Sequence, residues 1–479
     1  MIGRHVPAST LTGLLGGWAD ASGPAYRLLA ERLRLLIADG RISPGARLPS
    51  ERELTDALGV SRTTVASAYR ELRDRGYLTS KRGSGSITAL PTKVEPELGR
   101  HHAPGIDTDG LSDFTCAAPT AVPGISTAVA EALEDLPFHL ATPGYHPQGL
   151  PVLREEVAAS YEARGLPTSP DQIVVTAGAL AATSIAIRAM TQIGDRVLTE
   201  SPTHPNSVDS IRRSGARVVA VPMGPGDWDM PLLEATIRQT SPRAAWLVAD
   251  FQNPTGRLMS AADRQRLATA FARSRTTAIV DETLFELSLE GQEMPPPFAL
   301  FDPAGVITVG SVSKSFWGGL RIGWLRLPES LVARVLDARA SLDLGAPVLE
   351  QLVVARLLRD RATILPDRRS DLRERRDVLI EALREHLPTW RFEVPSGGLS
   401  LWCELPAAVG SSLVGVAQRN GVLLVAGSRF SPDAALEGFM RLPFTLDPDT
   451  LRDAVPRLAA SYGQLTEGPP LRRTATLIA

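Results

Sequence analysis

Residues 310–324, GSVSKSFWGGLRIGW, hold one of only three lysines in a chain of 479 residues that has 51 lysines and arginines. The other two are Lys81 and Lys93, and every remaining basic side chain is an arginine. A lysine amine can lose its proton and condense with an aldehyde, which a guanidinium cannot do. Serines and glycines surround Lys314, and Arg321 offers an anion clamp nearby. The stretch therefore predicts a site for an aldehyde that carries a phosphate, such as pyridoxal 5'-phosphate (PLP).

Codon bias alone could leave a chain with few lysines, and Lys314 would then be an ordinary surface residue. A second segment favours the cofactor. Residues 176–187, TAGALAATSIAI, read as a strand, a small-residue turn and a helix. The first N–H groups of such a helix are free to bind phosphate. The candidate donors are Gly178, Ala179 and Leu180.

Two polar residues complete the expected cofactor site. Asn253 lies in the turn NPTG, and Asp281 ends the apolar run TAIVDE. A carboxylate at the end of a strand can keep a pyridine nitrogen protonated, so that the ring accepts electrons. Each residue alone could be structural, but together with Lys314 they predict a PLP site.

From about residue 112 onward, short β-branched runs alternate with helical segments. This alternation is typical of βαβ units, and it predicts an α/β fold with a mostly parallel sheet and helices on both faces. The expected strands are QIVVTAG, DRVLTES, ARVVAVP, AAWLVAD, TAIVDE and VITVGS, and the clearest helices are ALAATSIAIRAM and AADRQRLATAFARS. We assign residues 112–479 to this domain and the Pro- and Gly-rich residues 91–111 to a linker.

Residues 48–78 show two helix starts. Ser50 with Glu53 forms a capping box, Gly59 ends the first helix, and Ser61 caps the second. Two short helices joined by such a turn are the helix-turn-helix pattern, in which the start of the second helix meets DNA. Two β candidates around KRGSG then predict a β-wing with a basic tip.

The charge distribution agrees with a DNA-binding N-terminus. Residues 1–90 carry a formal charge of +5 and residues 91–479 carry −7, for a total of −2. A basic N-terminal domain on an acidic body favours a polyanionic partner for that domain alone. We assign it to residues 23–90 and treat residues 1–22 as an arm or short helix.

Other function classes are disfavoured. The two cysteines, Cys116 and Cys403, show no metal-binding spacing and no disulfide framework, so we predict no metal and a reducing cytoplasm. We find no run of about 18 apolar residues, so no membrane span is expected.

Residues 24–87 closely resemble the winged helix-turn-helix domain of the GntR family. The similarity rests on PGARLPSEREL and GVSRTTVASAY. It implies a double-stranded DNA operator as partner, with contacts from two helix starts and the wing. The implied residues are Arg52, Ser61, Arg62, Thr63, Thr64, Lys81, Arg82 and Gly83.

Residues 112–465 resemble the class I/II aminotransferases of PLP fold type I, on the motifs NPTG, SVSKSFWGGLRIGW and PSGGLSLW. With the GntR-like domain, the chain is similar to the MocR/GabR group of PLP-dependent transcription factors. The resemblance implies that Lys314 forms the internal aldimine, Asp281 pairs with the pyridine nitrogen and Asn253 bonds the ring hydroxyl.

The same resemblance assigns further ligand contacts. Phosphate would be held by Ser311, Arg321 and the 178–180 turn, and by Tyr145 of a neighbouring subunit in a homodimer with shared sites. Arg441 would bind an effector carboxylate. The sequence departs from the family at two places: His204 stands where an aromatic ring usually covers the cofactor, and Thr283 and Leu284 stand where a tyrosine is usual.

These observations lead to one main hypothesis and two alternatives. The main one is a transcriptional regulator that senses an amino compound through an external aldimine, without physiological turnover, although residual transaminase activity is possible. The alternatives are a working aminotransferase with an incidental DNA-binding domain, and a sensor of free PLP that controls vitamin B6 metabolism.

Overall fold

The computed structural model describes residues 5–18, 23–81, 85–91, 110–224 and 226–466. The chain forms two compact units. The N-terminal unit contains Met1–Thr108 and Ala121–Glu134, and the C-terminal unit contains Asp109–Thr120 and Asp135–Ala479. Most of the predicted linker lies outside the described residues, so the domain limits given above stay a prediction.

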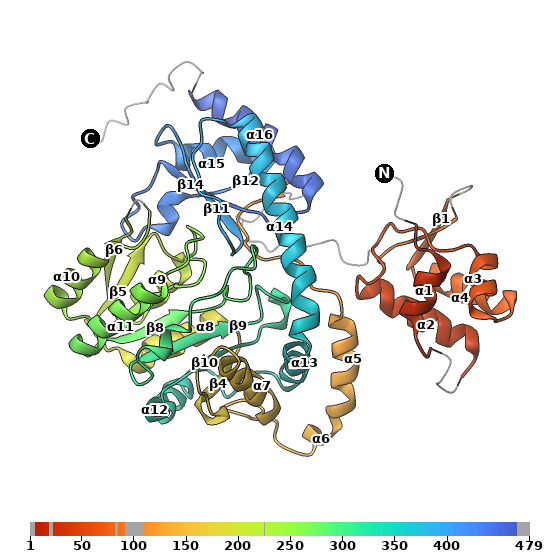
Figure 1. Cartoon of the computed structure of the whole chain (residues 1–479), viewed down its shortest axis with the longest axis horizontal. Coiled ribbons are helices and arrows are strands. Elements are labelled where there is room, and N and C mark those ends of the chain that lie inside the picture. The colour runs from red at the N-terminus through yellow and green to blue at the C-terminus, as the bar shows by residue number, and fades with distance from the viewer. Residues whose placement is uncertain (1–4, 19–22, 82–84, 92–109, 225, 467–479) are drawn as a thin grey trace, which may run out of the picture. The chain divides into compact units, whose positions relative to one another are not determined.

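The N-terminal unit is a small helical domain with a β-hairpin (Figure 1). Its apolar core includes Leu33, Leu54, Val65 and Tyr69, which are fully buried. The hairpin strands pair antiparallel, as a wing requires. Its elements are α1 (Ala8–Leu15), α2 (Ala25–Ala38), α3 (Glu51–Leu58), α4 (Arg62–Asp74), β1 (Leu78–Lys81) and β2 (Gly85–Thr88), with most of α5 (Ile125–Asp135).

The predicted helix signals are confirmed here. Ser50 and Glu53 bond each other's backbone N–H groups in a capping box. Gly59 closes α3 at a φ of 66°, a left-handed conformation that favours glycine. The predicted arm contains helix α1, which contributes Leu11 and Leu15 to the core of the unit.

The C-terminal unit is built on a seven-stranded sheet (Figure 1). All strands run in one direction except β10, which is antiparallel to both of its neighbours. The mostly parallel sheet predicted from the sequence is thereby confirmed. The strand order is β4 (Ile173–Thr176), β10 (Gly323–Arg326), β9 (Val306–Ser311), β8 (Thr277–Asp281), β7 (Ala244–Leu247), β5 (Arg196–Ser201) and β6 (Arg217–Pro222).

Helices cover this sheet because its strands are buried and apolar. Ile185, Ile211 and Val335, from three different helices, pack with Trp246 and Ile279 of the sheet in one core. The helices of this region are α6 (Pro137–Leu140), α7 (Pro151–Glu162), α8 (Ala179–Met190), α9 (Pro205–Arg213), α10 (Met230–Thr240), α11 (Ala261–Ser274), α12 (Glu329–Arg339) and α13 (Val348–Arg359), with short 3-10 turns at Pro170–Gln172, Phe298–Leu300 and Gly318–Leu320.

A second core forms where the C-terminal residues fold around smaller sheets. Leu379, Leu401, Leu442 and Leu458 belong to it. One sheet has the order β11 (Ser400–Glu404), β14 (Phe439–Pro443) and β13 (Val425–Ala426), and the other pairs β12 (Val422–Leu423) with β3 (Ser112–Asp113). The helices are α14 (Arg361–His386), α15 (Gly410–Arg419) and α16 (Pro448–Thr466), with a 3-10 turn at Gly427–Phe430.

Candidate functional site

The predicted cofactor residues gather at one edge of the large sheet. Asp281 is the last residue of β8 and Ser311 the last of β9, while Asn253 and His204 follow β7 and β5. Parallel strands present their carboxyl ends at a common edge, which is where ligands bind in open α/β sheets. Lys314 lies in the turn just beyond β9, so the fold delivers its amine to the same edge.

Lys314 is held inward by one hydrogen bond. Its Nζ donates to the carbonyl oxygen of Ala117 at 2.9 Å. Burial lowers the pKa of the amine, and the charge of Arg441 lowers it further, against opposing contributions from Cys116 and Asp281. A lowered pKa increases the fraction of neutral amine, which is the form that attacks an aldehyde.

Asp281 is a half-buried carboxylate of the site. Its Oδ1 accepts from the N–H of Thr283 at 2.8 Å. Burial raises the pKa of Asp281, which Thr283 and the charge of Lys314 partly oppose. A protonated ring nitrogen would stabilise the ionised carboxylate, so this environment fits a pyridinium partner.

Arg441 on β14 closes the site from the smaller sheet. Its Nη2 donates to the carbonyl of Thr115 at 2.6 Å, and its Nη1 lies 3.4 Å from Oδ1 of Asn253. The guanidinium lies over the ring of Phe430, and burial lowers the pKa of Arg441 to about 10. Its buried Nε has no acceptor among the described residues. A buried donor without a partner is costly, so the geometry suits an additional anionic acceptor.

A turn that could hold a phosphate lies at the start of α8. Gly178 caps this helix at a φ of 89°, and a Cβ there would lie 2.7 Å from Nη2 of Arg321. Arg321 donates to the carbonyl of Ala177 at 3.2 Å. The N–H of Gly178 already donates to the carbonyl of Thr176 at 2.8 Å, so of the three predicted donors those of Ala179 and Leu180, at the helix start near Arg321, remain for an anion. The hydroxyl of Ser311 lies 2.9 Å from the carbonyl oxygen of Ile322.

His204 lies directly before α9, and its imidazole ring is neutral. Its Nδ1 lies 3.1 Å from Oγ of Ser207. Burial, together with the charges of Lys314 and Arg441, lowers the pKa of His204 to about 3. An uncharged imidazole next to two cations can lie against an aromatic ring without a further desolvation cost.

The sequence reasoning missed two buried residues that support this edge. Gln252 donates to the carbonyl of Pro202 at 2.7 Å and to Oε1 of Glu200 at 3.0 Å, and its Oε1 accepts from the N–H of Thr255. It therefore ties the loop before His204 to the NPTG turn. Burial raises the pKa of Glu200 to about 7. A glutamine directly before NPTG was the available signal, but nothing in the sequence showed its partners.

The predicted DNA-contacting residues lie at two helix starts. Ser61 accepts from the N–H of Thr64 at 3.1 Å and leaves Arg62 and Thr63 exposed on the first turn of α4. Arg52 is exposed on α3, and Lys81 ends strand β1. The remaining two predicted wing residues, Arg82 and Gly83, lie outside the described residues.

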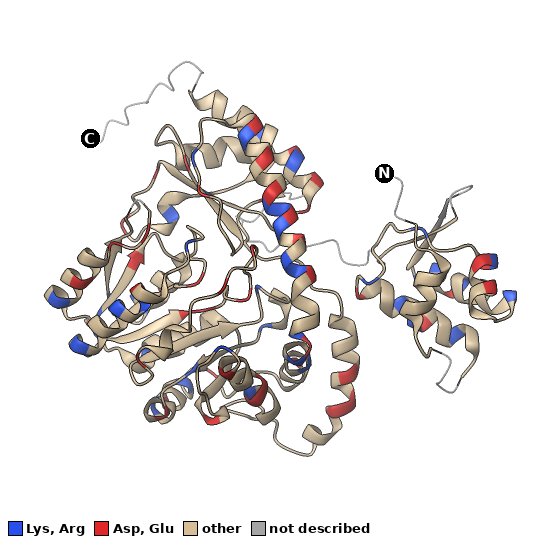
Figure 2. Ribbon diagram, in the orientation of Figure 1, with Lys and Arg blue, Asp and Glu red and all other residues tan. Residues whose placement is uncertain are grey.

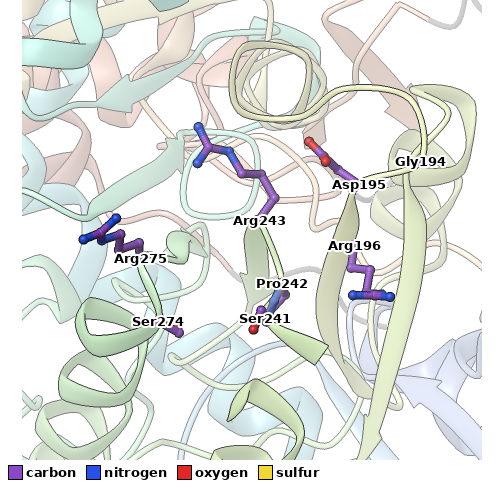
Figure 3. A pocket seen from close by; sticks show the side chains of 8 residues that line it. All are labelled: Gly194, Asp195, Arg196, Ser241, Pro242, Arg243, Ser274 and Arg275. Carbon is purple, nitrogen blue, oxygen red and sulfur yellow. The ribbon is translucent and has the colours of Figure 1, made fainter. Parts of the chain in front are cut away.

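Other candidate sites are less complete. Within the described ranges, no group of three or more His, Cys, Asp or Glu side chains could hold a metal ion, and no helix is long and apolar enough to cross a membrane. An open recess of about 380 Å³ lies at the opposite edge of the sheet, near the amino ends of β5 and β7 (Figure 3). Arg196, Arg243 and Arg275 line it, and it contains none of the predicted site residues.

Comparison with known families assigns both units. Residues 121–458 match the family described as aminotransferase class I and II, and residues 25–87 match the bacterial regulatory proteins of the gntR family. Both matches overlap the regions, residues 24–87 and 112–465, in which the sequence resembles these families.

The matching proteins include two transcriptional regulators and a solved aminotransferase. The chain is 32% identical to the HTH-type pyridoxine biosynthesis transcriptional regulator PdxR of Corynebacterium glutamicum, over 79% of this chain and 83% of that one. It is 28% identical to the probable rhizopine catabolism regulatory protein MocR of Rhizobium meliloti, over 92% and 94%. A solved structure of LysN, an alpha-aminoadipate aminotransferase from Thermus thermophilus, superposes with a TM-score of 0.67 at 28% identity, over 75% and 95%.

Proposed function

The chain belongs to the class I and II aminotransferase family and joins a GntR-family domain to it, as MocR-type regulators do, and we propose that it is a PLP-dependent transcriptional regulator that responds to an amino compound. One observation carries the proposal. Lys314, the only lysine after Lys93, lies half-buried just beyond the carboxyl end of β9, with Asp281 and Arg441 in electrostatic range.

The residues divide the work of binding. PLP supplies an aldehyde that condenses with amines and a ring that accepts electrons. Lys314 provides the amine, and Asp281 provides an acceptor for the ring N–H. Asn253 would bond the ring hydroxyl, and His204 would cover the ring face. The turn at Gly178–Leu180, together with Ser311 and Arg321, would hold the phosphate.

An effector would enter with its amino group toward Lys314 and its carboxylate toward Arg441. Two parallel N–H bonds make arginine well suited to a carboxylate. Thr283 and Leu284 replace the tyrosine expected beside the ring, so we propose ligand sensing without physiological turnover. If two conformations bind the ligand differently, the ligand shifts their populations and changes operator affinity.

We also propose that the regulator is a homodimer with shared sites. The Tyr145 side chain is 67% exposed, as expected for a residue that reaches a second subunit. Phe138 and Leu140 on the neighbouring helix α6 are 79% and 72% exposed. Large apolar side chains grouped this way on a surface are typical of an interface.

The cofactor proposal is tested by absorbance. Purified protein incubated with PLP should show a Schiff-base band, and Lys314→Ala should abolish it. Lys81→Ala, which removes a lysine of the N-terminal unit, is the matched control and should keep the band. A Lys314→Ala protein that is folded by circular dichroism and keeps the wild-type band would refute the proposal.

Effector identity is tested next by spectral titration with amino acids, followed by operator binding with each hit. Two alternatives give different results. The similarity to LysN favours a working aminotransferase, which would convert amino acids in half-reactions at enzymatic rates. The similarity to PdxR favours a sensor of free PLP, for which PLP alone would change operator affinity.

A further inference from the structure

A short segment crosses the candidate site between the seven-stranded sheet and the smaller sheets of the C-terminal unit. Residues 112–120, SDFTCAAPT, are called the strap here. Its first part is anchored to the smaller sheets: β3 pairs with β12, and the N–H of Phe114 donates to the carbonyl of Leu423 at 2.9 Å. Arg457 of α16 adds a bond of 2.7 Å to Oγ of Ser112.

The middle of the strap is held by three side chains on three consecutive carbonyl oxygens. Arg441 donates to Thr115 at 2.6 Å, Thr445 Oγ1 donates to Cys116 at 3.2 Å, and Lys314 donates to Ala117 at 2.9 Å. Two of these three donors are the groups that the proposed function assigns to ligand.

The far end of the strap is attached independently of those two groups. Arg368 of α14 donates to the carbonyl of Thr120, and the same guanidinium lies 3.3 Å from the carbonyl oxygens of Ser315 and Phe316. Any release caused by ligand would therefore be confined to the middle of the strap.

We propose that the strap is an internal competitor for the ligand site, so that ligand binding at Lys314 and Arg441 releases the carbonyls of Thr115 and Ala117. This inference rests on the proposed function. Condensation of the Nζ of Lys314 with the aldehyde carbon, with loss of water, would leave at most one N–H on that nitrogen and so would compete with the bond to Ala117. A carboxylate bound by two parallel N–H groups of Arg441 would take Nε, which has no acceptor among the described residues, and one N–H of Nη2, and so would compete with Thr115 for that nitrogen.

The strap lies next to the inter-domain segment in sequence. The strap follows residues 91–111, which lead from the DNA-binding domain. The strap is thus continuous in sequence with the segment that joins the two units, and its anchored first part lies between that segment and the carbonyls that ligand would release.

The competition predicts that a mutation that removes a hydrogen bond of the strap increases PLP affinity. Thr445→Val removes the bond to Cys116 and keeps the side-chain volume, without touching Lys314 or Arg441. Because a weaker strap competes less well, the variant should bind PLP about two- to tenfold more tightly, which corresponds to one ordinary hydrogen bond. Thr445→Ser, which keeps the hydroxyl, should bind like the wild type.

The matched control is Thr276→Val. Thr276 is also buried and donates to a carbonyl, that of Pro242, near the opposite edge of the sheet. It should leave PLP affinity unchanged. A stable probe, N-(5'-phosphopyridoxyl)-L-alanine, should gain more than pyridoxamine phosphate in Thr445→Val, because only the former carries a carboxylate for Arg441.

Two outcomes would refute the competition by the strap while leaving the proposed function intact. In both, Thr445→Val shows a normal Schiff-base band, and its PLP affinity is either unchanged or weaker than that of the wild type. Loss of the band in the wild type would instead refute the proposed function. Hydrogen exchange on the wild type provides a second measurement if Thr445→Val does not fold. Amides of residues 115–117 should exchange faster with PLP bound, while that of Phe114, which is bonded to Leu423, should not change; equal or slower exchange at 115–117 rejects the inference.

Discussion

The two units use positive charge in opposite ways. In the N-terminal unit, Arg52 and Arg62 extend into solvent from helix starts. In the C-terminal unit, Arg264 and Arg441 are buried and donate to specific oxygens. Exposed charges act at long range and are screened by salt, which suits a polyanion. Buried charges act only on what reaches them, which suits a small ligand of defined shape.

Arginine abundance alone therefore says little about DNA. Helix α14 is rich in basic side chains (Figure 2). Several of them bind backbone carbonyls of the same unit: Arg369 donates to Glu286, Arg373 to Leu289 and Arg375 to Thr445. These arginines hold segments together, and their charges are not available to a nucleic acid.

The largest expected effect comes from breaking a buried pair. Arg264 and Asp250 are both fully buried, with 2.6 Å between Nη2 and Oδ1. Arg264→Met would leave a buried carboxylate without its cation and should lower the free energy of unfolding by about 3–5 kcal/mol. Denaturant unfolding of the C-terminal unit, followed by circular dichroism, measures the change.

The partly exposed pair Arg34–Glu31 in the N-terminal unit, with side chains 21% and 46% exposed, is the comparison. Arg34→Met should cost only about 0–1 kcal/mol, because solvent screens the pair. Equal losses in both variants would break the contrast between buried and exposed charge.

The second prediction concerns DNA affinity. Arg62→Ala should weaken specific operator binding by about 1–3 kcal/mol if the side chain reads a base edge. If it contacts only phosphate, the loss should be equal for all sequences, and the salt slope should fall by about 1. Arg213→Ala, an exposed position on α9, should leave operator affinity unchanged, and an equal loss there would remove the distinction between the units.

The third prediction uses the neutral histidine among the buried cations. The unfolded chain binds a proton at His204 below a pH of about 6.5, whereas the folded site does so only near a pKa of about 3. The stability that this difference contributes is complete above pH 6.5 and is lost as the pH falls toward 3. At pH 5 the loss amounts to about 2 kcal/mol.

His204→Phe cannot bind a proton and should escape that loss. The unfolding free energy of the variant relative to the wild type should therefore rise by about 2 kcal/mol between pH 7.5 and pH 5. The measurement is denaturant unfolding at both pH values. A constant difference would mean that His204 titrates alike in both states.

The smallest effect is expected at a helix cap of the N-terminal unit. Ser61→Ala removes the acceptor for the N–H of Thr64 and should cost about 1 kcal/mol of stability. Hydrogen exchange of the α4 amides measures this local loss. Ser67→Ala in the middle of the same helix should be neutral or slightly stabilising, because alanine has the higher helix propensity, and an equal loss there would show that the effect at Ser61 does not come from capping.

Much of the fold could be predicted because its signals are local. The sequence placed α8 and α11 at the residues where they begin and end, and the six expected strands all form in the large sheet. The capping box at Ser50 and the left-handed Gly59 were readable within four residues of each helix end. Hydrophobic period and cap chemistry depend on neighbours in sequence, so one chain suffices to find them.

The rest could not be predicted because it depends on distant partners. Strand β10 begins at the end of the stretch quoted first, but its antiparallel place between β4 and β9 is decided by tertiary packing. Gln252 and the strap were missed for the same reason, since Thr115 and Arg441 are 326 residues apart. The role of Thr115 involves a main-chain oxygen, which every residue has, so no sequence pattern marks it.

The scarcity of lysine in this chain has a practical consequence. Most proteins present many surface amines to an added aldehyde, and random adducts obscure the specific one. Borohydride trapping of this chain should deposit label on almost a single nitrogen of the C-terminal unit, and the molar ratio of label to polypeptide would then count filled sites directly.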